Sequence, residues 1–295
     1  MSTSDRKVTV EIVGGLGNQM FCYAAGYSYA SKNNAFLKLD LSFFGDNALY
    51  GRDYRLDYYS VDESVFSSII FRIRFFRNIK YFLTKIFKFK GSIIESDASK
   101  LDQLFFEKMR CKNINLYGYW QNERYFFDYK NEIIEQLTLK SFHSKKKLNH
   151  KVLSSIRASN SVCIHYRSYG EVEVKEGDRK AMTVGMSYYR DCINQVKAKN
   201  KMVEFYLFGD VLNDEIEVLL GDSKFTRVDW NNATGDEVND MYLMSQCKYL
   251  VLANSSFSWW AGWLSGSANV FFPTRNDLVY YPTPPSSWNV VSWTN

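Results

Sequence analysis

The feature that most constrains the fold is a regular alternation of apolar and helical segments after residue 160. The apolar segments have the length and composition of β-strands, and the segments between them carry apolar residues at helical spacing. The expected strands are 162–167, 204–210, 225–230, 249–255 and 269–274, and the expected helices are 188–199, 213–220, 236–247 and 257–266. Strands that alternate with helices form a parallel sheet covered on both faces. The second half of the chain is therefore predicted to be a doubly wound α/β fold.

The first forty residues predict a second βαβ unit. The stretch 7–13 alternates as a strand does, a glycine turn follows at 14–17, a helix is expected over 18–31, and a second strand over 36–41. A polar helix and connector at 144–160 is a plausible boundary. A chain of 295 residues is long enough for two α/β domains.

We therefore expect two Rossmann-type halves, residues 1–155 and 156–295. The stretch 43–115 has no clear pattern, and we expect a helical basic insert at about 60–110.

Polar residues lie at or just after the carboxyl ends of three of the expected strands. They are Arg167 to Glu171, Gly209 with Asp210, and Asn254 to Ser256. Ligands of doubly wound folds bind beyond the carboxyl ends of the strands, so we expect these groups to converge on one crevice. The corner Asn254-Ser255-Ser256 would donate hydrogen bonds to phosphate or sugar oxygens.

Arg167 and His165 end a strand of buried character. Arginine binds phosphate through two parallel N–H bonds, so Arg167 is a candidate for an anionic ligand. The alternative is a structural ion pair or a solvated strand end.

The glycine turn also suggests a ligand. Gly15, Gly17, Asn18 and Gln19 lie where backbone N–H groups can hold an anion at a helix N-terminus. A dinucleotide-binding fingerprint is the competing interpretation, but Met20 occupies its third glycine position.

Metal and disulfide sites have little support in the sequence. There are three histidines, no H-E-x-x-H pattern and no two aspartates at D-x-D spacing. The five cysteines are scattered, which fits a reduced cytosolic chain. We find no signal-peptide core and no run of eighteen apolar residues, so we expect a cytoplasmic protein. The net charge of +5 is too small to indicate nucleic acid binding.

Residues 66–90 are unusually basic. They contain seven Lys or Arg among aromatic and aliphatic residues, and no acid. Such a segment is typical of an interfacial helix on an anionic membrane, so we expect peripheral contact with the inner face of the cytoplasmic membrane. The alternative is a helical pair whose aromatic face packs on the main body.

Two helices carry further candidates. Asp240 lies near the start of the helix at 236–247, where an acid stabilises the N-terminus or points into the crevice. In the tryptophan-rich helix, the spacing predicts one buried face made of Phe257, Trp260, Ala261 and Leu264.

Together these stretches resemble the bacterial α-1,2-fucosyltransferases of glycosyltransferase family 11. That family carries a G-G-L-G-N-Q-M-F opening, matched by 14–21, and an A-N-S-S-F-S-W-W stretch, matched by 253–260. A D-x-x-L-M-S helix is matched by 240–245. An H-x-R-R-G-D-Y stretch is matched in part by 165–167.

The resemblance implies a GT-B-like fold and metal-independent, inverting transfer of L-fucose from GDP-fucose to the 2-hydroxyl of a galactose in a surface glycan. It implies no cofactor beyond the donor substrate. The implied roles are the β-phosphate for Arg167 with His165 nearby, guanine for Asp240, and phosphates or nucleoside for Ser255, Ser256 and Phe257. Asn18 and its turn would face the fucose and the acceptor, a galactose-terminated glycan.

The chain departs from the family pattern after Arg167. Ser168-Tyr169-Gly170-Glu171 replaces Arg-Gly-Asp-Tyr, which leaves the general base open, with Glu171 and Glu173 as candidates. Other sugars or linkages stay open as alternatives. So do a dinucleotide oxidoreductase and a module that stacks single-stranded nucleic acid.

Overall fold

The protein divides into two compact units, Met1–Lys140 and Ser141–Asn295. The computed structural model describes residues 5–44, 52–61, 91–95, 100–140, 147–168, 182–209, 214–233, 235–275 and 282–293. The two units are described separately below.

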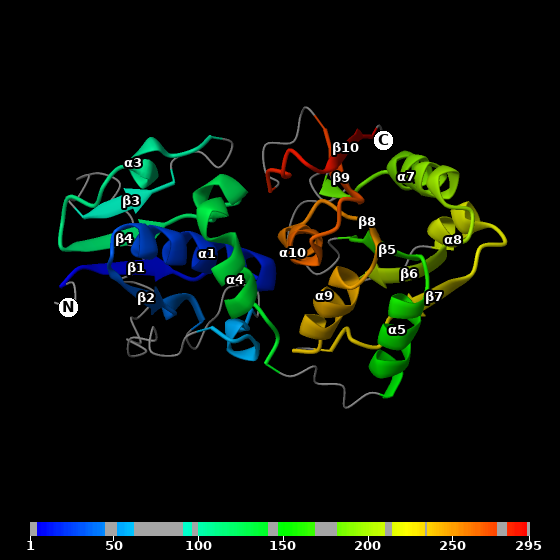
Figure 1. The fold of residues 1–295 in the computed structure, drawn as a ribbon, viewed down its shortest axis with the longest axis horizontal. Helices are drawn as coiled ribbons and strands as arrows, with labels where there is room; N and C mark the ends of the chain where they lie inside the picture. Colours follow the sequence, from blue (N-terminus) through cyan, green and yellow to red (C-terminus); the bar gives the residue numbers. More distant parts are fainter. Residues whose placement is uncertain are drawn as a thin grey trace. The chain divides into compact units, whose positions relative to one another are not determined.

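The N-terminal unit is built on a four-stranded parallel sheet of order β2-β1-β4-β3. Its strands are β1 (Lys7–Glu11), β2 (Phe36–Asp40), β3 (Ser92–Ile94) and β4 (Asn113–Tyr117). Its helices are α1 (Leu16–Lys32), α3 (Gln103–Phe106) and α4 (Lys130–Gln136), with short 3₁₀ turns at Ser42–Phe44, Leu56–Tyr58, Glu123–Tyr125 and Phe127–Tyr129. The predicted βαβ unit is confirmed as β1-α1-β2 (Figure 1).

Close contact between α1 and the sheet depends on Gly26. Val8 and Val10 of β1 point into the core and are fully buried. A Cβ atom on Gly26 would lie 2.6 Å from Cγ1 of Val10 and 3.1 Å from Cδ1 of Leu37. The helix therefore packs against β1 and β2 at a distance that only glycine allows.

Most of the expected helical basic insert lies outside the described residues. Between 60 and 110, the described residues contain β3 and the four-residue helix α3. Residues 62–90, which include the basic segment, lie outside the described residues. We did not predict β3 and β4, which lie in the stretch 43–115 or at its end, where the sequence has no clear pattern.

The C-terminal unit is built on a six-stranded parallel sheet of order β10-β9-β8-β5-β6-β7. The strands are β5 (Ser161–Tyr166), β6 (Glu204–Gly209), β7 (Phe225–Val228), β8 (Tyr249–Val251), β9 (Val270–Thr274) and β10 (Asn289–Ser292). The helices are α5 (Lys147–Ala158), α7 (Met186–Lys199), α8 (Asp214–Leu220), α9 (Glu237–Ser245) and α10 (Ser256–Ser265). The predicted doubly wound sheet is confirmed, and β10 extends it by a strand that we did not predict.

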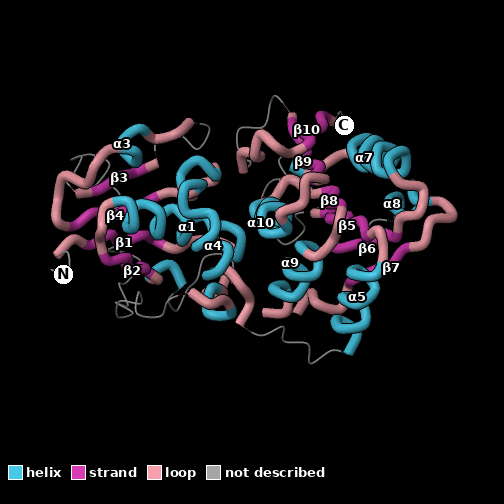
Figure 2. Tube along the Cα trace, viewed as in Figure 1, coloured by secondary structure: helices cyan, strands magenta, loops and turns pink. Residues whose placement is uncertain are grey.

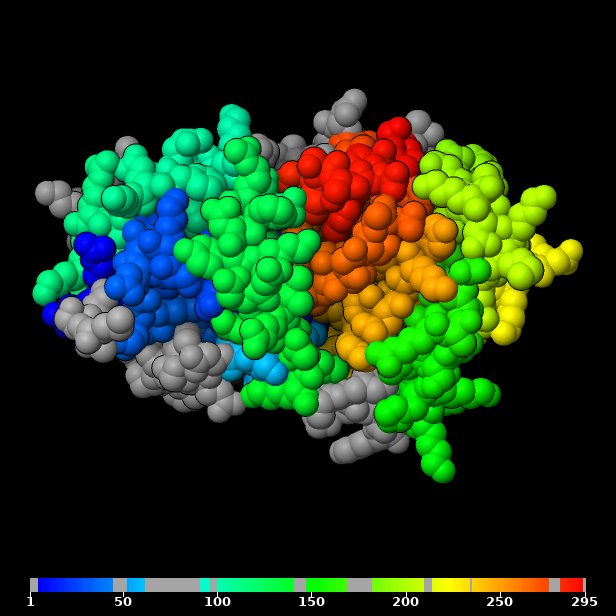
Figure 3. All heavy atoms as spheres, in the orientation of Figure 1, coloured from blue at the N-terminus to red at the C-terminus, as the bar shows by residue number. Residues whose placement is uncertain are grey.

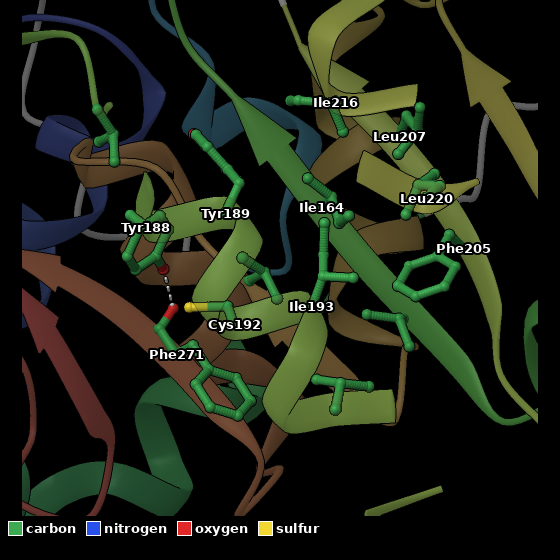
Figure 4. Close-up of a cluster of buried hydrophobic side chains, with 14 of the residues drawn as sticks. Ile164, Tyr188, Tyr189, Cys192, Ile193, Phe205, Leu207, Ile216, Leu220 and Phe271 are labelled. Atoms are coloured by element: carbon green, nitrogen blue, oxygen red, sulfur yellow. Dashed lines mark hydrogen bonds between the residues drawn. The ribbon is translucent and has the colours of Figure 1, made fainter. Parts of the chain in front are cut away.

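Helices cover both faces of this sheet, as Figure 2 shows. On one face, α7 and α8 close a core with Val162 and Ile164 of β5. Figure 4 shows this cluster, in which the Tyr188 hydroxyl donates to the carbonyl of Phe271 at 2.8 Å. On the other face lie α5, α9 and α10. The expected boundary at 155 falls inside α5, whose Asn149 donates to Asn231 of the C-terminal unit at 3.1 Å.

Helix α10 corrects the predicted single buried face. Phe257 and Leu264 are only half-buried, whereas Trp259 and Trp260 are fully buried and Trp263 almost so. The C-terminal segment covers the side that we expected to face solvent. Trp259 lies 5.6 Å from Trp288 and donates to the carbonyl of Thr283 at 2.9 Å. In Figure 3 this segment, in red, lies directly against the orange atoms of the helix.

Among the described residues, no helix is long and apolar enough to cross a bilayer.

We predict that Gly26→Val destabilises the protein by about 2 kcal/mol or more, because the added methyl groups overpack the α1–β1 contact. Ser31→Val is the matched control, since it places the same side chain at an exposed position of the same helix. Urea unfolding followed by circular dichroism measures both. Equal midpoints for the two variants would contradict this account of the packing.

Candidate active site

The carboxyl ends of β5 and β8 lie at the point where the strand order of the C-terminal sheet reverses. After β5 the chain builds β6 and β7 on one side, then crosses through α9 to place β8 on the other. Ile164 pairs with Val251, so the residues that follow the two strands leave the sheet side by side. Doubly wound folds bind ligands at such a switch point.

Alternate residues of β5 point to opposite faces of the sheet. Val162 and Ile164 face α7 and α8, and Cys163 and His165 face α9 and α10. His165 is buried, its ring lies 5.7 Å from that of Phe257, and its Nδ1 is hydrogen-bonded to Oγ of Ser258. The Tyr189 hydroxyl donates to the carbonyl of His165 at 3.1 Å. Contacts from both faces therefore fix the histidine.

Ser255 caps the N-terminus of α10. Its backbone is extended, and its Oγ accepts from the N–H of Ser258 at 3.0 Å. The same hydroxyl donates to Oγ of Ser258 at 3.1 Å. Ser255, Ser258 and His165 thus form one hydrogen-bonded chain from the helix cap to the imidazole.

This chain lets us assign a tautomer to the imidazole. Oγ of Ser258 accepts from Ser255, and we assign its own proton to the bond with Nδ1 of His165. A neutral histidine that accepts at Nδ1 carries its proton at Nε2. With this assignment, His165 is a hydrogen-bond donor through Nε2.

The first turn of α10 begins with Ser256 and Phe257, both half-buried, and Asn254 before the cap is buried. Backbone N–H groups in the first turn of a helix have no partner within the helix. Together with the helix dipole they favour an anion at this position.

Arg167 follows β5 two residues after His165. The strand alternation assigns it to the face of α9 and α10, and its Nε atom is buried. The adjacent carbonyl of Ser168 accepts from the Thr183 hydroxyl at 3.3 Å. The ends of β5 and β8 therefore carry a guanidinium, an imidazole and a capped helix N-terminus.

A buried amide network orients Asp240 on α9. The Asn231 amide donates to Oδ1 of Asp240 at 2.7 Å and to Oδ1 of Asn149 at 3.0 Å. Asn149 also accepts from the indole N–H of Trp230 at 2.6 Å. Both asparagines are fully buried, so the carboxylate has a fixed orientation.

The glycine turn occupies the corresponding edge of the N-terminal unit. Gly14 has a φ of 74°, and Gly15 is the residue before α1. Gly17 is buried, and Asn18 is half-buried and accepts from Gln121 Nε2 at 2.8 Å.

Gln19 is fully buried and bonds only to backbone groups within the described part of the chain. Its Nε2 donates to the carbonyls of Gly14 (3.0 Å) and Asp53 (2.8 Å), and its Oε1 accepts from the N–H of Arg55 (2.9 Å). These bonds hold the turn in shape, so contact between Gln19 and a ligand is not expected from this geometry.

Three of the expected site residues, Glu171, Glu173 and Asp210, lie outside the described residues. Within the described ranges, no group of three or more His, Cys, Asp or Glu side chains is arranged to hold a metal ion. Burial raises the pKa of the Cys22, Cys163, Cys192 and Cys247 thiols, which makes them poor nucleophiles.

Sequence reasoning missed Ser258, Asn231, Asn149 and Gln121. Ser258 could have been found from one feature of the sequence. It is a serine among tryptophans in a helix, and such a serine needs a hydrogen-bond partner when it is buried. The others act through residues far away in the sequence, and nothing local reveals them.

Comparison with known proteins places the chain among glycosyltransferases. Residues 1–277 match the model of the family described as Glycosyl transferase family 11. An alpha-1,2-colitosyltransferase of Escherichia coli is 33% identical over 294 residues, or 95% of this chain and 97% of that protein. The O-antigen biosynthesis glycosyltransferase WbnK of Escherichia coli is 24% identical over 273 residues, or 85% and 88%.

A solved structure has the same fold. The alpha-1,6-fucosyltransferase NodZ, soaked with GDP-fucose, aligns with a TM-score of 0.53 and 16% identity over 90% of this chain and 94% of NodZ. This likeness confirms the predicted GT-B-like α/β fold class.

We predict that Ser258→Ala changes the tautomer of His165 and costs about 1–3 kcal/mol of stability, because Nδ1 loses a buried donor. Two-bond ¹⁵N–¹H correlation spectra of ¹⁵N-histidine-labelled protein report the tautomer. The three histidines of the chain make the spectrum easy to assign.

Ser265→Ala is the control, because it removes a hydroxyl from the last turn of the same helix, where it bonds to the carbonyl of Gly262. A parent protein with its His165 proton on Nδ1 would show that the assigned direction of the hydrogen bonds is wrong.

Proposed function

Because the chain belongs to glycosyl transferase family 11, we propose that it transfers L-fucose from GDP-L-fucose to the 2-hydroxyl of a galactose residue, with inversion at the anomeric carbon. The observation that carries the proposal is the position of Arg167 and His165 at the end of β5, with His165 hydrogen-bonded to the first turn of α10 at the switch point of the C-terminal sheet. These groups suit a nucleoside diphosphate, and the named relatives are glycosyltransferases.

The diphosphate would bind at Arg167 and at the first turn of α10. As the bond between fucose and the β-phosphate breaks, negative charge grows on the leaving group. A guanidinium and helix N–H groups stabilise that charge directly, with no requirement for a divalent metal. The sugar passes through an oxocarbenium-like state, and the Nε2–H of His165 would donate to a phosphate oxygen.

Guanine recognition is assigned to Asp240. A carboxylate can accept both the N1–H and the 2-amino group of guanine, and the Asn231–Asn149 network holds this carboxylate in one orientation. Asn254, Ser255, Ser256 and Phe257 would line the diphosphate and the nucleoside.

The acceptor in this proposal is a galactose-terminated glycan of a surface polysaccharide or O-antigen. The likeness to WbnK, named for O-antigen biosynthesis, supports it. Glu171 or Glu173 would assist removal of the acceptor proton, and residues 66–90 would contact the anionic membrane surface.

A second candidate donor has a specific observation in its favour, namely the 33% identity to an alpha-1,2-colitosyltransferase. Colitose is L-fucose without its 3-hydroxyl. The same diphosphate site and the same linkage would serve both sugars, so the donor pocket alone would separate them. A pocket that hydrogen-bonds the 3-hydroxyl rejects the sugar that lacks it.

We expect purified protein to release GDP from GDP-L-fucose when a β-galactoside is present, and to form an α-1,2 linkage in the product, assigned by NMR. GDP-colitose and GDP-D-mannose are assayed in parallel. Excess chelator should leave the rate within about twofold. Preference for GDP-colitose would favour the second candidate. Loss of activity in chelator with recovery in Mg²⁺ would exclude the metal-independent mechanism.

We expect Arg167→Ala to lower the rate roughly a hundredfold or more, about 3 kcal/mol of transition-state stabilisation, because one guanidinium neutralises most of the leaving charge. Arg167→Lys should also be severely impaired, since it keeps the charge and loses the planar pair of N–H donors. Ser168→Arg should be tolerated, since it restores the family pattern. GDP release is measured for each variant.

Arg190→Ala is the matched control, because it removes an arginine whose side chain is 59% exposed on α7. Circular dichroism confirms folding. A folded Arg167→Ala enzyme within tenfold of the parent would show that Arg167 is not catalytic.

A further inference from the structure

Two side-chain amides meet at the carboxyl edge of the N-terminal sheet. Asn18 lies in the first turn of α1, which follows β1, and Gln121 follows β4, the parallel neighbour of β1. Gln121 Nε2 donates to Oδ1 of Asn18 at 2.8 Å. The pair therefore lies at the switch point of this sheet, where the chain has built β2 on one side of β1 and β4 on the other.

One hydrogen bond between two amides leaves an NH₂ group on one and a carbonyl oxygen on the other. Among the described residues, Nδ2 of Asn18 and Oε1 of Gln121 make no further hydrogen bond. Both side chains are half-buried and therefore reachable from solvent. The pair presents one donor and one acceptor next to each other.

The turn that carries Gln121 is held rigidly. The Glu95 carboxylate, which follows β3, accepts from the N–H groups of Tyr119 (2.8 Å) and Trp120 (2.9 Å). Trp120 is fully buried with a φ of 55°, and its ring packs 5.2 Å from that of Tyr125. A side chain on Gly118 would overlap Cβ of Glu95 at 2.5 Å. Gln121 is therefore positioned before any ligand binds.

The surroundings of the pair are open and contain an aromatic ring. A Cβ atom on Gly15 would meet no atom within 4 Å. Tyr119, two residues before Gln121 in the sequence, is 46% exposed. Neutral amides with an exposed tyrosine nearby in the sequence match the hydroxyl groups and the apolar face of a sugar better than they match an anion.

We propose that Asn18 and Gln121 form a subsite for one hydroxyl group of a neutral sugar, with Tyr119 beside the sugar ring. A hydroxyl group is both a donor and an acceptor, so it satisfies Oε1 of Gln121 and Nδ2 of Asn18 at once. This inference rests on the proposed function, in which two sugars take part: the fucose of the donor and the galactoside acceptor.

The test is Gln121→Ala, with Gln103→Ala as control because Gln103 is an exposed glutamine of the same unit. We expect the KM for one sugar substrate to rise about tenfold, as for a lost hydrogen-bonding pair, while the dissociation constant of GDP in calorimetry stays within about twofold. Asn18→Ala should have the same effect. The double variant should have no larger one, because either change removes the pair.

The assays separate the two sources of the hydroxyl group. A higher KM for the galactoside identifies the acceptor, and slower hydrolysis of GDP-fucose without acceptor identifies the donor sugar. Saturation-transfer NMR with methyl β-galactoside measures acceptor binding without turnover.

The outcomes also separate this subsite from the proposed function. If the parent transfers fucose and Gln121→Ala leaves both sugar parameters within twofold, the subsite is excluded and the function stands. If the parent transfers no sugar, yet its saturation-transfer signal disappears in Gln121→Ala and persists in Gln103→Ala, the subsite stands and the proposed function fails.

Discussion

The strand order of the C-terminal sheet reverses at β5, and this switch point determines where the unit can do chemistry. The connections after β5 and after β8 run to opposite sides of the switch point, which leaves a crevice beyond the carboxyl ends of these two strands. The backbone groups at the ends of β5 and β8 therefore need other partners, and polar side chains supply them. The Tyr189 hydroxyl on the His165 carbonyl is one such partner, and the cap of α10 is another.

The helix cap and the imidazole share the same hydrogen bonds, so stability and chemistry are coupled at this position. Ser255 satisfies a helix N–H that would otherwise lack a partner, and its hydroxyl is also bonded to Ser258, which is bonded to His165. A substitution made to alter the histidine therefore also disturbs the start of α10. The Asn149–Asn231 network does the same kind of work for Asp240 on α9, since it satisfies buried amides and orients the carboxylate with the same bonds.

Local patterns were enough to predict most of the C-terminal sheet, the β1-α1-β2 unit and the strand ends that carry His165, Arg167 and Ser255. Strand alternation and turn chemistry depend on neighbours in the sequence. The hydrogen-bond partners within the site could not be predicted, because residues far apart in the sequence, such as Gln121 and Asn18 or Asn231 and Asn149, come into contact only in the folded chain. The single buried face expected for α10 was wrong for the same reason. A segment around Trp288, distant in the sequence, packs on that helix, and the spacing of apolar residues within a helix does not predict such a contact.

Burial of the cysteines has a practical consequence for spectroscopy. Four of the five thiols lie in the two cores, and Cys111 is the half-buried one, just before β4. It lies at the amino end of that strand, whereas Gln121 follows its carboxyl end. A maleimide fluorophore should therefore attach to native protein at a single position without any engineered substitution. Such a probe would report on the N-terminal unit from the edge opposite to its amide pair.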